Sequence, residues 1–160
     1  MASIGNTSLN EGIPKLKDAF VVIIKTEWNA EITNELEAGA IRVLDNAGIK
    51  HKTFVVPGAV EITFAINAFH KVNRPATSAF IALGAVVRGD TPHFDYVCRS
   101  VTDGVTMLNC KLDVPVIFGV LTVNSVEQAK ARLGGTHGHK GEEAGLTAIK
   151  MIHFNRLINH

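Results

Sequence analysis

The stretch SAFIALGAVV at residues 78–87, followed directly by RGDTPH at residues 88–93, decides the fold. An unbroken run of small and β-branched residues is typical of a parallel strand that is covered on both faces. The run stops at Arg88-Gly89, and the pattern beyond it predicts a helix that begins near His93. Backbone N–H groups in front of such a helix can face an anion, and Gly89 lets a ligand come close. The stretch therefore predicts an α/β fold in which a buried strand delivers a ligand-binding loop.

The same alternation of apolar runs and helical periodicity continues through the rest of the chain. Apolar runs predict strands at residues 20–24, 52–56, 78–87 and 114–121. Helices are expected at about residues 29–47, after Pro57-Gly58, at about 93–112, from Ser125 to before Gly134-Gly135, and at about 142–158. Such repetition implies right-handed βαβ units. We expect one domain over residues 1–160, a three-layer α/β/α sandwich around a four-stranded parallel sheet (flavodoxin-like), with an N-terminal arm at residues 1–18 that could extend a neighbour's sheet.

Apolar residues at helical spacing indicate which face of each helix is buried. Gly48 is the expected stop of the first helix. The inward-facing residues are expected to be Ile32, Leu36, Ala40, Val43, Leu44 and Ala47 in the first helix, Ile62, Ala65, Ile66 and Phe69 in the second, Val97, Val101, Val105 and Leu108 in the third, and Ala144, Ala148, Met151 and Ile152 in the last. Cys98 and Cys110 fall in the third helix and are interpreted as small buried apolar residues.

Composition limits the classes of partner and compartment. The chain has 160 residues, and 16 basic against 15 acidic side chains leave a net charge of +1 without a basic stripe, so nucleic acid is not an expected partner. No apolar run approaches the roughly 20 residues of a membrane span. Residues 1–14 lack the apolar core of a signal peptide. Two cysteines form no disulfide framework, so we expect a soluble protein in the reducing cytoplasm.

Unusual residues gather where the predicted strands end. Trp28-Asn29 follows the first strand, residues 57–61 follow the second, and residues 88–93 follow the third, while Phe118 lies within the fourth. In parallel sheets, ligands bind outside the carboxyl ends of the strands. This coincidence predicts one binding site at that edge.

The residue types at this edge suggest roles, each with a structural alternative. Trp28, the only tryptophan, could stack on a heteroaromatic ring or cap the first helix. Asn29 could bind substrate, act as the N-cap of that helix, or do both. Glu61 could accept hydrogen bonds from hydroxyl or ring N–H groups, or complement the dipole of the second helix. His93 is a candidate for proton transfer at neutral pH, and Asp95 and Tyr96 could orient it or face solvent.

Two cations and two histidines follow later in the chain. Arg132 could clamp a phosphate with its bidentate guanidinium or cap the end of a short helix. Lys140 precedes the last helix. His137-Gly138-His139 supplies two potential metal ligands without a third nearby, so no metal site is expected.

Four motifs in order carry a resemblance to a known family. They are residues 84–97, Trp28-Asn29, VPGAVE at residues 56–61, and RLGG at residues 132–135 leading to Lys140-Gly141. The chain resembles the lumazine synthase family (6,7-dimethyl-8-ribityllumazine synthase) from about residue 20 to residue 157. The resemblance implies a catalytic His93 and substrate contacts at Trp28, Asn29, Gly58, Ala59, Val60, Glu61, Ala85, Val86, Val87, Asp90, Thr91, Phe118, Arg132 and Lys140.

The family's activity follows as an expectation. It condenses 5-amino-6-(ribitylamino)uracil with 3,4-dihydroxy-2-butanone 4-phosphate in riboflavin biosynthesis, and it needs no metal or organic cofactor. Trp28 would stack on the pyrimidinedione, Glu61 with backbone groups of Ala59 and Val60 would hold the ribityl chain, and His93 would move protons. Asp90 departs from the small neutral residue of many relatives, so its side chain is expected to turn away from the phosphate.

The resemblance also implies an assembly. Family members form pentamers whose sites lie between subunits, so Phe118, Arg132 and Lys140 would be supplied by a neighbour. Some members build shells of twelve pentamers and associate with riboflavin synthase, and the short connection from Arg132 to Lys140 fits shell formation. Two alternatives remain at this stage, an archaeal-type riboflavin synthase and a non-catalytic shell protein that binds flavin or lumazine.

Overall fold

Four parallel strands in the order β2-β1-β3-β4 form the centre of the molecule. The structure is a computed structural model that describes residues 11–72 and 76–159. Its elements are β1 (Phe20–Thr26), α1 (Ala30–Asn46), β2 (Lys50–Val56), α2 (Ala59–Val72), β3 (Ala79–Val87), α3 (His93–Lys111), β4 (Val116–Val123), α4 (Val126–Lys130), β5 (Leu133–Gly135), β6 (Gly138–His139) and α5 (Lys140–Ile158).

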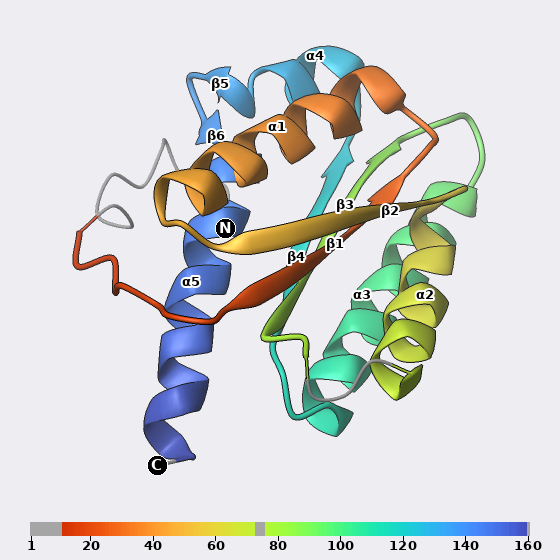
Figure 1. Cartoon of the computed structure of the whole chain (residues 1–160). Coiled ribbons are helices and arrows are strands. Elements are labelled where there is room, and N and C mark those ends of the chain that lie inside the picture. Colours follow the sequence, from red (N-terminus) through yellow and green to blue (C-terminus); the bar gives the residue numbers. More distant parts are fainter. Residues whose placement is uncertain (1–10, 73–75, 160) are drawn as a thin grey trace.

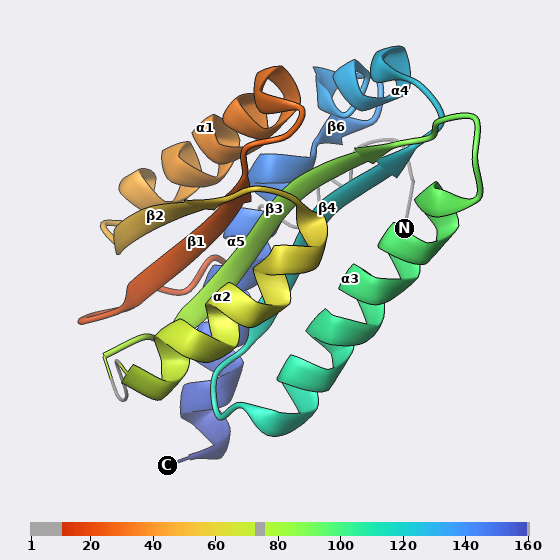
Figure 2. The same ribbon diagram turned by 90° about the vertical axis from the view of Figure 1, so that its right-hand side faces the viewer.

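Helices cover both faces of this sheet. Helices α1 and α5 lie on one face, and α2 and α3 lie on the other, so that the sheet is seen between two helical layers (Figure 1). Turning the molecule brings α2 and α3 in front of the strands, which cross behind them (Figure 2). The predicted α/β/α arrangement around a four-stranded parallel sheet is confirmed.

Alternating side chains of the inner strands supply two separate cores. Val21 and Ile23 of β1 pack with α1 and α5, whereas Val22 and Ile24 pack with α2 and α3. All four side chains are at most 1% exposed. Burying each such side chain contributes about 1.5–3 kcal/mol before the entropic cost of folding is counted. An apolar run without polar interruptions is thus what a strand between two helical layers requires.

Helices α1 and α5 approach each other closely through glycines. A Cβ on Gly141 would overlap the carbonyl oxygen of Leu36, and a Cβ on Gly39 would overlap the ring of His139. A Cβ on Gly145 would lie 3.1 Å from the carbonyl oxygen of Ala40. The first turns of α5 are therefore pressed against the backbone of α1, which leaves them little freedom to move.

The helix boundaries follow from local signals in the sequence. Gly48 adopts φ +67° directly after α1, and its N–H donates to the carbonyl of Asp45 at 2.9 Å, as expected for a glycine stop. Ser125 Oγ accepts a hydrogen bond from the N–H of Gln128 at 3.3 Å, which confirms the predicted start of α4.

Four details of the prediction were wrong. The segment after α4 contains a short antiparallel hairpin, β5–β6, because Gly134 and Gly138 adopt φ +103° and +71° and turn the chain back. Strand β4 begins two residues later than expected, since Asn109 hydrogen-bonds both backbone groups of Val116 at 2.8–2.9 Å. Met151 is 36% exposed rather than inward-facing, because it lines an open hollow with Leu112 and Phe154, whereas Ile149 and Ile152 in the same turn are buried in the core.

Cys110 is the fourth correction, because it is exposed rather than buried. Cys98 is half-buried, and burial, with a smaller contribution from Asp95 and an opposing one from Arg88, raises the pKa of its thiol. Both cysteines are free. The buried stripe of the third helix consists of Val101, Gly104, Val105 and Leu108, and Val97 packs against the same core.

The N-terminal arm is held against α5 where it enters β1. Arg156 Nη1 donates to the carbonyl of Lys17 at 2.7 Å, and Nη2 donates to that of Asp18 at 3.3 Å. The expected pairing of the arm, residues 1–18, with a neighbour's sheet stays a prediction, and residues 1–10 of the arm lie outside the described residues. Within residues 11–72 and 76–159, no helix has the length and hydropathy to cross a membrane.

Candidate active site

The chain that leaves β1 docks on the chain that leaves β2. The N–H of Glu27 donates to the carbonyl of Val56 at 2.8 Å, and the N–H of Trp28 donates to that of Pro57 at 3.1 Å. Trp28 is consequently held beside the start of α2, yet its side chain is 68% exposed. An aromatic ring fixed by its backbone and open on one face can stack on a planar ligand.

Gly58 brings Trp28 and Glu61 together. A Cβ at this position would lie 3.0 Å from Trp28 Cε3 and 3.0 Å from Glu61 Oε2. The missing side chain lets the indole and the carboxylate approach the same stretch of backbone. Val60 beside them is exposed, whereas Ala59 is buried in the core under α2.

Asn29 has a different role from the capping role that the sequence allowed. It is the residue before α1, but it adopts φ +59° and its side chain does not cap the helix. Its Nδ2 group donates instead to the carbonyl of Ala85 in β3 at 2.8 Å. Asn29 therefore ties the turn after β1 to the carboxyl half of β3.

The loop after β3 is organised by Arg88, which sequence reasoning did not select as a site residue. Its Nη2 pairs with Asp95 Oδ1 at 2.9 Å, its Nε donates to Asn124 Oδ1 at 3.1 Å, and its guanidinium lies 4.1 Å from the centroid of the Phe94 ring. Asp95 thus orients Arg88 and not His93. The i, i+7 spacing of Arg88 and Asp95 across a loop was the available signal.

His93 begins α3 with an exposed side chain. Its backbone N–H donates to Thr91 Oγ1 at 3.4 Å, and its ring has no hydrogen-bond partner among the described residues. Gly89, Asp90 and Thr91 are also exposed. The N-terminus of a 19-residue helix carries partial positive charge, so this loop is suited to an anion beside a free imidazole. The orientation expected for the Asp90 side chain stays a prediction.

We call the residues at this edge the strand-end cluster: Trp28, Asn29, Gly58, Ala59, Val60, Glu61, Ala85, Val86, Val87, Asp90, Thr91 and His93. The three remaining predicted residues, Phe118, Arg132 and Lys140, line a separate hollow of about 510 Å³ along the free edge of β4. We call it the β4 groove. Glu143, Ala144 and Thr147 of α5 complete its wall.

The charged side chains of the β4 groove already have partners. Lys140 Nζ pairs with Glu143 at 2.7 Å, and these side chains are only 14% and 24% exposed. Arg132 Nη1 donates to the carbonyl of Gln128 at 2.8 Å. The N–H of Lys140 donates to the carbonyl of Arg132 at 2.9 Å, so the β5–β6 hairpin holds the two cations next to each other.

The strand-end cluster and the β4 groove share no lining residue, although they adjoin where Ala85, Val86 and Val87 of β3 pair with Leu121, Thr122 and Val123 of β4. Phe118 pairs with Ala82 in the middle of the sheet, five positions before the end of β3. No residue of the strand-end cluster lines the groove. Among the described residues, no hydrogen bond or ion pair joins His93, Trp28 or Glu61 to Arg132 or Lys140.

Comparison with known proteins identifies the family. Residues 18–156 match the family model described as 6,7-dimethyl-8-ribityllumazine synthase. The chain belongs to this family. The 6,7-dimethyl-8-ribityllumazine synthase of Parabacteroides distasonis is 44% identical over 146 residues, which is 89% of this chain and 90% of the relative. Those of Bacteroides fragilis and Bdellovibrio bacteriovorus are 47% and 49% identical over 135 and 133 residues, in each case 82% of this chain and 93% and 73% of the relative.

The resemblance seen in the sequence is thereby confirmed, and with it the prediction of a lumazine synthase enzyme of riboflavin biosynthesis. The roles of the individual site residues stay predictions.

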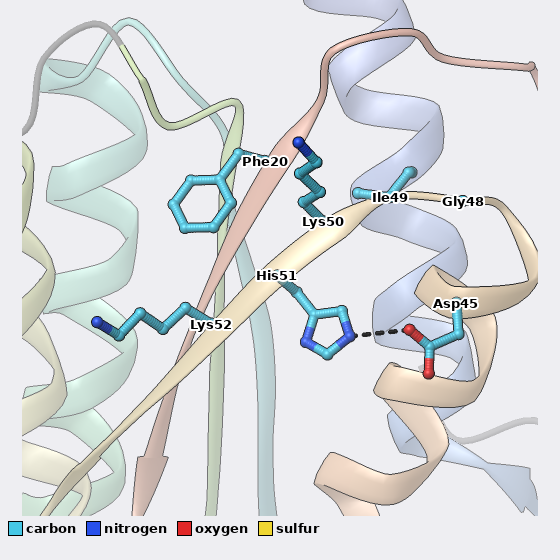
Figure 3. A pocket seen from close by; sticks show the side chains of 7 residues that line it. All are labelled: Phe20, Asp45, Gly48, Ile49, Lys50, His51 and Lys52. Atoms are coloured by element: carbon cyan, nitrogen blue, oxygen red, sulfur yellow. Dashed lines mark hydrogen bonds and ion pairs between the residues drawn. The ribbon is translucent and has the colours of Figure 1, made fainter.

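A further hollow lies at the opposite end of the sheet, where β1 and β2 begin. Phe20, Asp45 and residues 48–52 line it, and His51 Nε2 pairs there with Asp45 Oδ1 at 3.0 Å (Figure 3). None of the residues that the family resemblance predicts as substrate contacts lines this hollow. Because parallel sheets bind ligands at their carboxyl ends, this hollow is not the candidate site.

The described residues also contain no group of three or more His, Cys, Asp or Glu side chains arranged to hold a metal ion. His137 and His139 lie in the β5–β6 region, and His137 Nδ1 is buried without a hydrogen-bond partner.

Proposed function

We propose that this enzyme condenses 5-amino-6-(ribitylamino)uracil with 3,4-dihydroxy-2-butanone 4-phosphate to give 6,7-dimethyl-8-ribityllumazine, phosphate and water, in a site that two copies of the chain complete together. One observation carries the shared site: Arg132 and Lys140 line the β4 groove, and among the described residues no hydrogen bond or ion pair joins them to Trp28, Glu61 or His93. A condensation that releases phosphate needs a ring platform, a proton shuttle and cations within one site.

The uracil substrate occupies the strand-end cluster in this proposal. The exposed indole of Trp28 stacks on the pyrimidine ring, and Glu61 beside it accepts hydrogen bonds from the ribityl hydroxyls. Backbone groups of Ala59 and Val60 at the start of α2 assist. The close approach of Trp28 and Glu61 to Gly58 supports these assignments.

The phosphate substrate lies between the start of α3 and a neighbour's groove. Backbone N–H groups near Thr91 and the dipole of α3 attract the phosphate, and Arg132 of the second copy contributes a charge-assisted pair. The amine of the uracil attacks the ketone, and His93 moves protons during imine formation and during loss of phosphate. The unpaired, exposed ring of His93 is suited to this role.

An archaeal-type riboflavin synthase consumes two lumazines and needs no phosphate site. The anion-binding start of α3 and the pair of cations held by the β5–β6 hairpin argue against that alternative. A non-catalytic shell protein would not need the free imidazole of His93 at the start of α3.

Exposed apolar side chains support an oligomer. Phe64 and Val72 of α2 are 76% and 82% exposed, and Met107 of α3 is 50% exposed. Large apolar surface of this kind marks contact with other subunits. We propose a pentamer, with twelve pentamers in a shell that could hold riboflavin synthase, and sedimentation of dilute protein at neutral pH tests it. A monomer or dimer would contradict the shared site, and a stable free pentamer would contradict only the shell.

Mixing two variants tests the shared site directly. His93→Ala damages the strand-end cluster and Arg132→Ala damages the β4 groove. If two copies form each site, dissociating and reassembling an equal mixture should leave about one quarter of the sites intact. The readout is lumazine fluorescence with both substrates, compared with each variant reassembled alone. No recovery in a mixture that has demonstrably reassembled would place both halves of the site in one chain.

A cytoplasmic location also remains a prediction, which fractionation of the source cells can test.

A further inference from the structure

His139 is the N-cap of α5, the helix that carries one wall of the β4 groove. Its Nδ1 atom accepts a hydrogen bond from the N–H of Glu142 at 3.4 Å. An imidazole nitrogen can accept this bond only when it carries no proton. Lys140, which forms the half-buried ion pair of the groove with Glu143, lies in the turn that this bond closes.

The His139 ring is also seated against α1. Gly39 leaves the space that the ring fills, since a Cβ at that position would overlap it. One turn further along α1, Arg42 Nη2 pairs with Glu142 Oε1 at 2.9 Å. Gly39 and Arg42 of α1 thus contact His139, which precedes α5, and Glu142 in its first turn.

The same residue belongs to the hairpin that carries Arg132. His139 pairs with Leu133 in β5–β6, and the next residue, Lys140, donates its N–H to the carbonyl of Arg132 at 2.9 Å. One side chain therefore lies at the junction of α1, the hairpin and α5, next to both cations of the groove.

We infer that His139 is a positioning residue: its neutral ring, seated on Gly39 and capping α5, fixes Arg132 and Lys140 in the geometry that receives the phosphate-bearing substrate. This inference rests on the proposed assignment of the β4 groove to the active site. Because a protonated ring cannot cap α5, the groove is ordered at neutral pH and loosens in mild acid.

Neighbouring groups set the pH at which this happens. Burial is the main cause that lowers the pKa of His139, and Arg42 lowers it further, whereas Glu142 and Glu35 raise it. Strand β5 carries no ionisable side chain, and Lys140 pairs with Glu143. Since the folded-state pKa lies below the ordinary value of about 6.5, the stability that the neutral ring contributes is complete above that pH. It is lost as the pH falls through the folded-state pKa.

Three variants of the full chain test the inference. His139→Ala removes the cap, Gly39→Ala displaces the ring from the other side, and His139→Asn keeps a cap acceptor that does not titrate. We expect the first two to raise the KM for the butanone phosphate at pH 7.5 by about fivefold, the size of a lost helix cap, with a smaller change in the KM for the uracil. His139→Asn should stay within about twofold of the parent.

The pH profile separates positioning from a general loss of stability. As the pH falls below about 6.5, the KM for the butanone phosphate should rise more steeply in the parent than in His139→Asn, because protonation of the substrate phosphate affects both proteins alike. His153→Ala, an exposed histidine on the same helix, is the matched control and should follow the parent. If His139→Ala leaves KM unchanged while Arg132→Ala raises it, the inference is wrong and the proposed site stands. If Arg132→Ala also changes nothing, the groove assignment itself fails. Should Gly39→Ala not fold, the two His139 variants and the profile still decide.

Discussion

The strand-end cluster holds its side chains on exposed turns, whereas the β4 groove holds its charges on a hairpin and a long helix packed against α1. Trp28 and His93 have free side chains and are fixed only through the backbone. Lys140 is paired with Glu143 and largely buried. In the proposed two-part site, one half can adjust to a flat substrate, and the other half is organised before substrate arrives. Preorganised charge is the more effective way to stabilise a leaving phosphate, because no reorganisation is needed during the reaction.

The largest effect is expected at the exposed half. Replacing His93 by Ala should slow turnover by roughly 10- to 1,000-fold, because proton transfer then depends on water. Substrate binding and the fold should change little, since the ring contacts no described partner. Steady-state lumazine production measures the change, with His153→Ala as a control. Turnover equal to that of the parent would reduce His93 to a structural residue.

Truncating the groove should affect one substrate more than the other. Arg132→Ala removes a charge-assisted contact worth on the order of 2–4 kcal/mol to the phosphate-bearing substrate. The uracil should bind nearly as before. Separate titration of the two substrates distinguishes these results, and Arg99→Ala, an exposed arginine 3.9 Å from Asp103, is the matched control. Equal losses for both substrates would show that the phosphate does not lie at Arg132.

Variants of Asn29 test how much its bond to β3 and its left-handed backbone conformation change the stability of the fold. Asn29→Ala loses the bond to the Ala85 carbonyl and puts alanine, which tolerates the left-handed region less well than asparagine, at φ +59°, so the free energy of unfolding should fall by about 2–3 kcal/mol. Asn29→Gly loses the same bond without the backbone strain and should cost about 1 kcal/mol less. Urea unfolding gives both values. A glycine variant as unstable as the alanine variant would show that φ at this position carries no cost.

The smallest effect is optical. Because Trp28 is the only tryptophan, its fluorescence reports on the strand-end cluster alone. Riboflavin or a ribityl-pyrimidine should quench it by stacking within a few ångströms. The Arg132→Ala variant should show the same quenching, since Arg132 is assigned to the phosphate-bearing substrate and these ligands carry no phosphate. Emission unchanged at saturating ligand would place Trp28 outside the site.

Much of the fold could be predicted because burial on two faces leaves a plain mark on the sequence. Residues 78–87 need apolar side chains in both directions, and β3 is found there with a boundary shift of one residue. The β5–β6 hairpin left no such mark, since it is short and rich in glycine. Turn glycines indicate a change of direction without saying which strands pair.

The strand-end cluster was predictable by topology, because parallel strands bring their carboxyl ends together. The groove was not, since Phe118 lies mid-strand and Arg132 and Lys140 meet only through the hairpin. Those three residues came from the family resemblance. Arg88 was not selected, and the bond of Asn29 to β3 was not foreseen, because their partners, Asp95, Asn124 and the Ala85 carbonyl, lie across loops that no periodicity describes.

Arg156 joins the end of α5 to the segment before β1, at the edge of the sheet where the strands begin. By binding the carbonyls of Lys17 and Asp18, it joins the last turns of α5 to the segment that enters β1. Both segments lie where the strands begin, whereas Trp28, Glu61 and His93 lie where the strands end (Figure 1). A dye or affinity label attached beside Lys17 or after α5 would therefore leave the edge with Trp28, Glu61 and His93 unobstructed. These two positions are suited to immobilising the enzyme.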